Sequence, residues 1–83
     1  MDEFQQEVVD ILVEKAVAMT GKPADSLGPD TSFVDDLGAK SVNIVQFASA
    51  LEDEYEVEVP FMELNKCKTF RDAAELIDKK LSM

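Results

Sequence analysis

The chain has 83 residues, of which 18 are acidic and 8 are basic, and its formal charge is −10. This surplus of carboxylates argues against nucleic acid and anionic membranes as partners, because both recruit clustered Lys and Arg. With no histidine and a single cysteine, the chain lacks the commonest general base and the ligands of a thiolate metal cage. No apolar run approaches the roughly 20 residues that span a bilayer, and the amino terminus is acidic, unlike a signal peptide. We therefore expect a cytoplasmic monomer with no membrane span and no nucleic-acid partner.

Hydrophobic residues make up 46% of the chain, which is enough to build a core despite the charge. A chain this short has room for only one core, so we expect a single domain over residues 1–83. The charge is unevenly placed: nine acids and one base, Lys40, lie between Asp30 and Glu63, leaving −8 on 34 residues. The other 49 residues carry nine acids and seven bases, or −2. The acidity therefore belongs to the middle of the chain.

Apolar residues recur at helical spacing from Asp2 to about Met19, which predicts a first helix. Its apolar stripe consists of Phe4, Val8, Ile11, Leu12, Ala16 and Met19. Val9, Val13 and Val17 widen the stripe, so this helix is expected to contact neighbours on two sides. Gly21 and Pro23 should end it, because glycine accepts a left-handed cap and proline cannot continue a helix.

The connection from Gly21 to about Lys40 is long, and it contains all three glycines and two of the three prolines. Long connections inside a compact domain are often functional. Ordering so many residues requires apolar contacts that offset the lost entropy. The side chains expected to fix this loop to the core are Leu27, Phe33, Val34 and Leu37.

A second helix is predicted from Ser41 to about Tyr55, because apolar residues recur there at positions i, i+3, i+4, i+7 and i+11. This core stripe consists of Ile44, Phe47, Ala48, Leu51 and Tyr55. Val42 and Val45 fall on a different face of the helix. They are expected to form a small apolar spot near solvent, beside many acids.

Residues 55–59 alternate apolar and charged side chains, which is typical of a strand. No second strand is available to pair with them, so we predict an extended linker that ends at Pro60. Residues 61–65 are expected to form one short helical turn. Its apolar side chains, which should point mostly inward, are Phe61, Met62 and Leu64.

Thr69 is predicted to cap a last helix, with Asp72 three residues later as a weaker form of the capping box. The expected core face of this helix consists of Phe70, Ala73, Ala74, Ile77 and Leu81. The predicted fold is therefore all-α: a four-helix bundle with three main helices, a short third helix and a long loop after the first.

Two kinds of site can be tested against the sequence. A calcium-binding EF-hand needs glycine at position 6 and glutamate at position 12 of its loop, and both registers, starting at Asp25 or at Asp30, fail. Cys67 lies between Lys66 and Lys68, which would lower the pKa of a thiol. No histidine is present to complete a nucleophile–base pair, and Cys67 occupies an apolar position, so we interpret it as a core residue. We predict no metal site and no catalytic residue.

Ser41 stands at the predicted start of the second helix, and two interpretations are open. Serine is among the preferred helix N-cap residues, and on position alone the cap is favoured. No Glu or Gln completes a capping box, since Ile44 lies three residues later. A hydroxyl beside the backbone N–H groups of a helix amino terminus is also a favourable place for a phosphate ester. The second interpretation is therefore an attachment point.

The segment from Ser32 to Val42, Ser-Phe-Val-Asp-Asp-Leu-Gly-Ala-Lys-Ser-Val, resembles the modification segment of bacterial acyl carrier proteins, usually Asp-Leu-Gly-x-Asp-Ser-Leu. The resemblance continues through Leu51-Glu-Asp-Glu-Tyr55 and Glu58-Val-Pro60 to the apolar pattern of the last helix. It covers nearly the whole chain. Length, acidity and helix order agree with it.

The resemblance implies that Ser41 receives a 4′-phosphopantetheine arm from coenzyme A through a separate magnesium-dependent phosphopantetheinyl transferase. The thiol of the arm would carry acyl groups to fatty acid, polyketide or related biosynthetic enzymes, and the protein itself would catalyse nothing. Its interior would shelter part of the acyl group. The positions that match the family's partner-binding surface are Asp36, Leu37, Val42, Val45, Gln46 and Glu52. The acidic middle of the chain would then attract enzymes with basic patches. The competing hypothesis is a small acidic interaction module in which Ser41 is only a cap.

Two departures from the family pattern stand out. Lys40 occupies the place of the usual aspartate directly before the serine, which reverses a charge that a transferase meets. The short third helix is also more apolar than is typical. Both departures suggest a specialised carrier. A peptidyl carrier is disfavoured, because such carriers usually have a second glycine where Ala39 stands.

Overall fold

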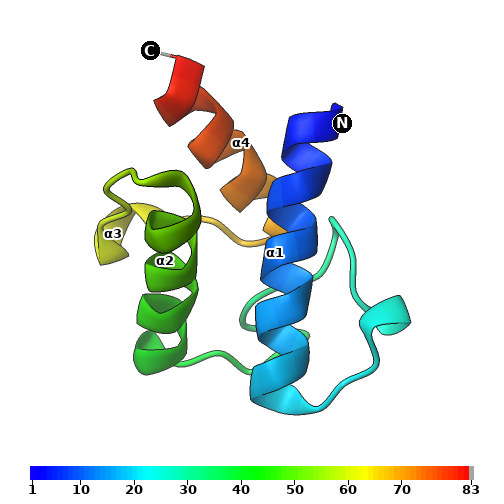
Figure 1. Ribbon diagram of the computed structural model, residues 1–83. Helices are drawn as coiled ribbons and strands as arrows, with labels where there is room; N and C mark the ends of the chain where they lie inside the picture. Colours follow the sequence, from blue (N-terminus) through cyan, green and yellow to red (C-terminus); the bar gives the residue numbers. More distant parts are fainter. Residues whose placement is uncertain (83) are drawn as a thin grey trace.

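The computed structural model describes residues 1–82, which form four α-helices and one short 3-10 turn, with no strand among them (Figure 1). The elements are α1 (Glu3–Thr20), η1 (Ala24–Ser26), α2 (Ser41–Tyr55), α3 (Phe61–Leu64) and α4 (Phe70–Ser82). The predicted all-α bundle is confirmed. None of these helices is both long and apolar enough to cross a membrane.

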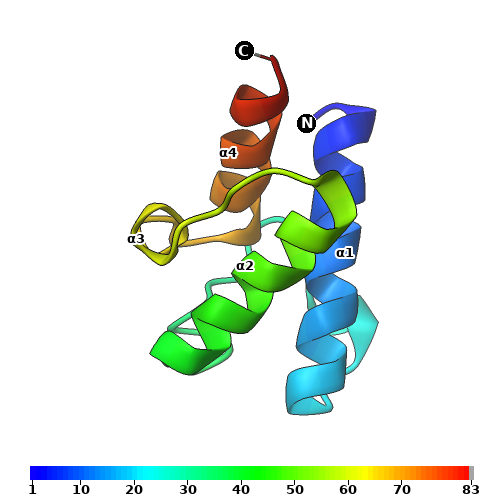
Figure 2. The same cartoon turned by 60° about the vertical axis from the view of Figure 1, so that its left-hand side comes forward.

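α1 packs against both α2 and α4, as its wide apolar stripe predicts, and α3 packs against α2. In both views the amino terminus and the end of α4 lie at the same end of the bundle, and α2 begins at the opposite end (Figures 1 and 2). A hydrogen bond of 2.8 Å from the Gln5 amide to the Asp78 carboxylate joins α1 to α4. The ring of Phe4 meets the ring of Tyr55 edge-on at 5.3 Å and joins α1 to α2.

Local residues explain where most helices begin and end. The Asp2 carboxylate accepts the Gln5 N–H at 2.8 Å and caps α1. Gly21 ends α1 in the left-handed conformation, with φ of 75° and its N–H on the Val17 carbonyl. α2 ends at Glu56, a residue other than glycine that adopts the same left-handed conformation, with φ of 52°.

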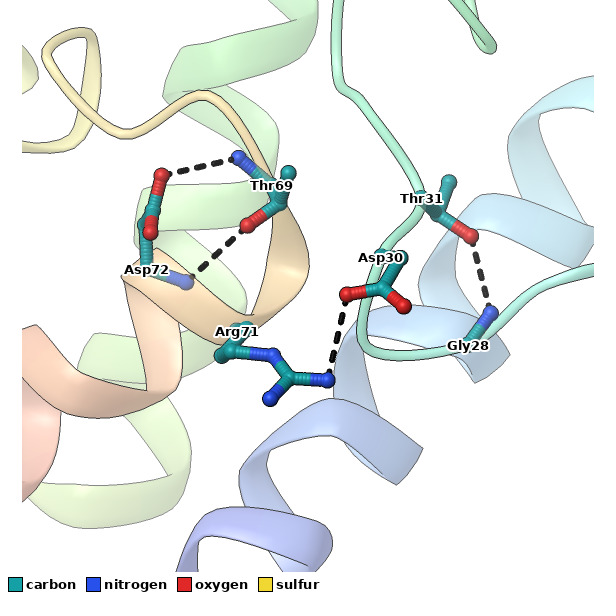
Figure 3. A network of polar contacts seen from close by, with 6 residues as sticks. All are labelled: Gly28, Asp30, Thr31, Thr69, Arg71 and Asp72. Carbon is teal, nitrogen blue, oxygen red and sulfur yellow. Dashed lines mark hydrogen bonds and ion pairs between the residues drawn. The ribbon is translucent and has the colours of Figure 1, made fainter. Parts of the chain in front are cut away.

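The predicted cap of α4 is confirmed as a reciprocal capping box. The Thr69 hydroxyl accepts the Asp72 N–H at 3.2 Å, and the Asp72 carboxylate accepts the N–H groups of Lys68 and Thr69 at 3.0 and 3.3 Å. These bonds fix the first turn of α4 (Figure 3).

Among residues 1–82, fifteen hydrophobic side chains are buried and form the core. They are Val8, Val9, Leu12, Ala16, Phe33, Ile44, Phe47, Ala48, Leu51, Val59, Leu64, Phe70, Ala73, Ala74 and Ile77. Most were expected from the helical stripes. Val9 is fully within the core rather than at its margin, because α1 is covered on two sides.

Three predicted inward side chains, Val34, Met62 and Leu81, are exposed, and several others are only partly buried. Val34 is 63% exposed, and of the loop residues only Phe33 is fully enclosed, with Leu27 and Leu37 partly buried. Met62 is 68% exposed, because one helical turn has only one inward face and Leu64 occupies it. Leu81 lies 45% exposed beyond the last contact of α4 with the core. Tyr55 is only partly buried.

Tyr55 completes the contact between α1 and α2 with its hydroxyl, which donates a hydrogen bond of 3.2 Å to the Glu7 carboxylate. Burial raises the pKa of Tyr55 well above its usual value, and the bond to Glu7 adds to the shift.

Phe33 joins the long loop to the helices. Its ring centroid lies 5.1 Å from that of Phe47 on α2 and 5.0 Å from that of Phe70 on α4, and the latter two lie 6.0 Å apart. Tilted and edge-on aromatic pairs at these distances are favourable beyond their burial of apolar surface. We call these three residues the aromatic cluster.

Backbone bonds clasp the same loop to the start of α4. The Phe33 N–H donates to the Lys68 carbonyl at 3.0 Å, the Phe70 N–H to the Thr31 carbonyl at 3.0 Å, and the Arg71 N–H to the Pro29 carbonyl at 2.8 Å. These bonds include an isolated bridge between Ser32 and Thr69 that the sequence analysis did not foresee.

Side chains reinforce the clasp (Figure 3). Arg71 lies 3.1 Å from the Asp30 carboxylate, and the buried Thr31 hydroxyl accepts the Gly28 N–H at 2.8 Å. The ion pair is exposed and contributes little by itself. The clasp therefore depends mainly on its backbone bonds and the aromatic cluster.

Cys67 is half-buried against the core, as interpreted, and its Sγ lies 3.8 Å from the Glu63 carbonyl oxygen. Burial, to which the nearby acids Asp72, Glu63 and Glu75 add, raises the pKa of the Cys67 thiol to about 11. The expectation that Lys66 and Lys68 lower this pKa is therefore wrong. Desolvation outweighs the two lysines.

We expect Phe33→Ala to destabilise the fold by about 3–5 kcal/mol, because it leaves a cavity between α2 and α4. Val34→Ala, at the exposed neighbouring position, should change the free energy of unfolding by less than about 0.5 kcal/mol. Urea unfolding followed by circular dichroism measures both. If Phe33→Ala does not fold, Phe33→Leu provides a smaller loss in the free energy of unfolding at the same position. Equal effects of the two alanine substitutions would contradict the account.

We expect Cys67 in the folded protein to react with iodoacetamide at pH 8 more than about tenfold slower than free cysteine, because its raised pKa leaves little thiolate. Unfolding in urea should abolish the difference. The rate is measured by mass spectrometry of the peptide that contains Cys67. A folded-state rate equal to that of free cysteine would refute a buried thiol.

Candidate functional site

Ser41 is the first residue of α2 and is exposed. The N-cap position belongs to Lys40, whose backbone is extended, with φ of −103° and ψ of 175°. The expectation that Ser41 is the N-cap is therefore wrong by one residue. Within residues 1–82 the Ser41 hydroxyl forms no hydrogen bond, so its oxygen is available for chemistry.

Asn43 supplies the side-chain acceptor of the capping box at the start of α2, which Ile44 cannot supply. Its side-chain oxygen accepts the Lys40 N–H at 2.9 Å, while the Lys40 carbonyl accepts the N–H groups of Asn43 and Ile44 at 2.9 and 3.0 Å. The sequence analysis missed Asn43 because it placed the cap one residue late. The signal was a short polar side chain three residues after Lys40.

The backbone at the start of α2 offers unused donors. Within the described chain, the N–H groups of Ser41 and Val42 have no acceptor. Such groups carry the positive end of the helix dipole and favour an anion. They lie directly beside the Ser41 hydroxyl.

The segment before Ser41 is a compact turn. The Asp36 carboxylate accepts the Ser32 N–H at 2.6 Å, and the Ser32 hydroxyl accepts the Asp35 N–H at 3.0 Å. The N–H of Gly38 donates to the Val34 carbonyl at 2.9 Å. Gly38 has φ of 63°, a conformation that side-chain-bearing residues rarely adopt. This turn follows Phe33 and delivers the chain to the start of α2.

The six predicted partner-binding residues have different surroundings. Val42 and Val45, on the solvent side of α2, are 61% and 47% exposed, and Gln46 beside them is also exposed. Asp36 is exposed while its carboxylate holds the turn, and Leu37 is partly buried. The Glu52 carboxylate accepts the Val59 N–H at 2.8 Å and joins α2 to the linker that follows.

A cavity of about 160 Å³ lies between the end of α1, the turn before Ser41 and the first half of α2. Its lining residues are Met19, Thr20, Leu37, Ala39, Asn43 and Phe47. Two of them, Ala39 and Asn43, are each two residues from Ser41. A larger open hollow of about 470 Å³ runs along residues 22–31 and is lined by more polar groups. Among the described residues, no three His, Cys, Asp or Glu side chains are grouped to hold a metal ion.

Comparisons with known proteins agree with this geometry. A family model described as "Phosphopantetheine attachment site" matches residues 10–77. The chain is 40% identical over 73 residues to an acyl carrier protein of Bdellovibrio bacteriovorus, covering 88% of each chain. It is 37% identical over 75 residues to an acyl carrier protein of Thermobifida fusca, covering 90% of this chain and 95% of the other. Residues 10–77 include Ser41, the turn before it, all of α2 and α3, and parts of α1 and α4. The chain belongs to the acyl carrier protein family.

Proposed function

We propose that Ser41 is the residue of this acyl carrier protein to which the 4′-phosphopantetheine arm is attached. Acyl carrier function and a covalent arm follow from the family. The observation that carries the choice of Ser41 is its exposed hydroxyl, without a hydrogen bond within residues 1–82, at the first position of α2. A capping role alone is not favoured, because Lys40 is the N-cap.

The residues at the start of α2 fit the phosphate of the arm. A phosphodiester on Ser41 Oγ would lie beside the N–H groups of Ser41 and Val42, which have no acceptor within the described chain. α2 also has no acidic residue in its first turn to repel it. The donor set is therefore suited to one bound anion.

The attachment step is a group transfer by a separate magnesium-dependent transferase. Ser41 Oγ loses its proton to a base of that enzyme and bonds to the phosphorus that bears the pantetheine of coenzyme A. The P–O bond to the second phosphate breaks, and adenosine 3′,5′-bisphosphate leaves. The attached arm supplies a thiol that holds acyl groups as thioesters. We propose that residues 1–83 act as one carrier domain that catalyses no reaction itself.

The cavity beside Ser41 is the interior space best placed to shelter part of an acyl group. Its walls include the apolar side chains of Met19, Leu37, Ala39 and Phe47. At about 160 Å³ it is small, and each methylene that it buries contributes about 0.8 kcal/mol. We propose that it takes only a short acyl segment.

The solvent side of α2 is the proposed docking face for partner enzymes, and it comprises Val42, Val45 and Gln46. Val42 and Val45 form its exposed apolar centre, and it belongs to the segment between Asp30 and Glu63, which carries a charge of −8. Such a field speeds encounter with a basic surface and weakens with salt. Met62, on α3, adds exposed apolar surface next to α2. The proposed partners are the transferase and fatty acid, polyketide or related synthetic enzymes. A cytoplasmic location and a monomeric state stay predictions.

Incubation of the purified protein with coenzyme A, magnesium and a broad-specificity phosphopantetheinyl transferase should add one phosphopantetheine, seen by intact mass. Ser41→Ala should gain nothing, because it removes the nucleophilic oxygen. Ser49→Ala, at an exposed serine of the same helix, should be modified like the wild type. An unmodified wild type across several transferases, or modification of Ser41→Ala, would refute Ser41 as the attachment residue.

Val45→Glu should lower kcat/KM for this modification by about tenfold, since it places a charge at the apolar centre of the docking face. Ala18→Glu adds the same charge at an exposed position of α1 and is the matched control. Urea unfolding should show that both variants keep their stability within about 0.5 kcal/mol. Equal rates for the two variants would place the docking face elsewhere.

A further inference from the structure

Lys40 is an unusual residue to find at the start of α2. It is the only base among nine acids between Asp30 and Glu63. It is exposed, and within residues 1–82 no carboxylate lies within the 4.0 Å of an ion pair from its Nζ. The ion pairs of the described chain are Arg71 with Asp30 and Lys80 with Glu63. The one cation of the acidic segment is thus uncompensated.

Its position makes this unfavourable in the unmodified protein. An N-cap side chain normally accepts hydrogen bonds from the first turn, but an ammonium group has no lone pair to accept with. A positive charge at a helix amino terminus also opposes the helix dipole. The first turn of α2 has no acidic side chain, and within the described chain the N–H groups of Ser41 and Val42 have no acceptor, so nothing in that turn balances the positive charge of Lys40.

We propose that Lys40 binds the phosphate of the arm carried by Ser41, an inference that rests on the attachment residue proposed above. The Cα atoms of neighbouring residues are about 3.8 Å apart, so the flexible lysine stem brings Nζ within reach of a phosphate on Ser41 Oγ. The phosphate oxygens accept from Nζ and from the N–H groups of Ser41 and Val42. Lys40 is therefore a positioning residue for the first segment of the arm.

Covalent attachment to Ser41 keeps the phosphate close to the Lys40 side chain. The phosphate is bonded to the neighbouring side chain, so its effective concentration at Nζ is far higher than that of any free anion. Hydrogen bonds between an ammonium group and a phosphate are charge-assisted. In the modified protein the anion compensates both Lys40 and the helix dipole. Modification should therefore raise the stability of the wild type more than it raises the stability of a variant that lacks the positive charge at position 40.

The test compares unmodified and modified forms of the wild type, Lys40→Arg, Lys40→Gln and Lys40→Asp, each verified by intact mass. Modification should raise the Tm of the wild type by about 2–5 °C more than that of Lys40→Gln. Lys40→Arg should retain the gain. Lys40→Asp should raise the Tm of the unmodified form, since aspartate is a good N-cap, and should reverse the gain on modification through repulsion of the phosphate.

Lys79→Gln is the matched control, because Lys79 is exposed in the last turn of α4 and should shift both forms equally. The ³¹P resonance of the modified protein should move in Lys40→Gln and stay in place in Lys79→Gln. If every variant is modified but the gain in Tm and the ³¹P resonance are the same in all of them, the inference about Lys40 is overturned and Ser41 stands. If no variant gains mass, the proposed attachment residue fails, and the inference about Lys40 fails with it.

Discussion

The packing of Phe33 between Phe47 and Phe70 is the contact on which the position of Ser41 depends. Residues 21–40 form no helix longer than the three-residue turn η1, and ordering such a segment costs about 1–2 kcal/mol per residue in backbone entropy. The aromatic cluster and the backbone clasp to α4 offset this cost at one place, directly before the turn that leads into α2. A single ring thus joins the loop, α2 and α4.

This arrangement separates the protein's apolar core from its charged surface around Ser41. Ile44, Phe47 and Leu51 face the core, so the opposite side of α2 presents Val42 and Val45 to solvent. The same helix therefore stabilises the bundle on one side and meets partners on the other. Because the start of α2 lies at the end of the bundle away from both the amino terminus and the end of α4, an enzyme can approach Ser41 without meeting either (Figure 2).

Helical periodicity was sufficient to predict that the helices exist. Local signals predicted where α1 ends and where α4 begins. Gly21 ends α1, and Thr69 with Asp72 begins α4, as expected from residue type. α2 ends at Glu56, where a left-handed residue other than glycine gives no such signal. Its start at Ser41 was predicted correctly, but the N-cap was assigned to Ser41 because serine is a better N-cap than lysine, and the hydrogen bond from the Lys40 N–H to Asn43 identifies Lys40 as the cap.

Tertiary contacts determine which apolar side chains are buried, and the periodicity of the sequence does not predict this. Val34 and Met62 are as apolar as their buried neighbours Phe33 and Leu64, and only the packed fold distinguishes them. The clasp joins residues about 40 positions apart through backbone groups, so no pattern of side chains in the sequence predicts it. The candidate serine was identified from the family's motif, whereas the environment that frees its hydroxyl required the structure.

The most direct test of the account is tandem mass spectrometry of the protein isolated under acidic conditions from the cells that make it. We expect the peptide containing Ser41 to carry phosphopantetheine, with its thiol either free or bound to an acyl group as a thioester. Treatment with hydroxylamine should release the acyl group and leave the arm in place. A protein population whose Ser41 is wholly unmodified, or whose arm lies on another serine, would contradict the central claim.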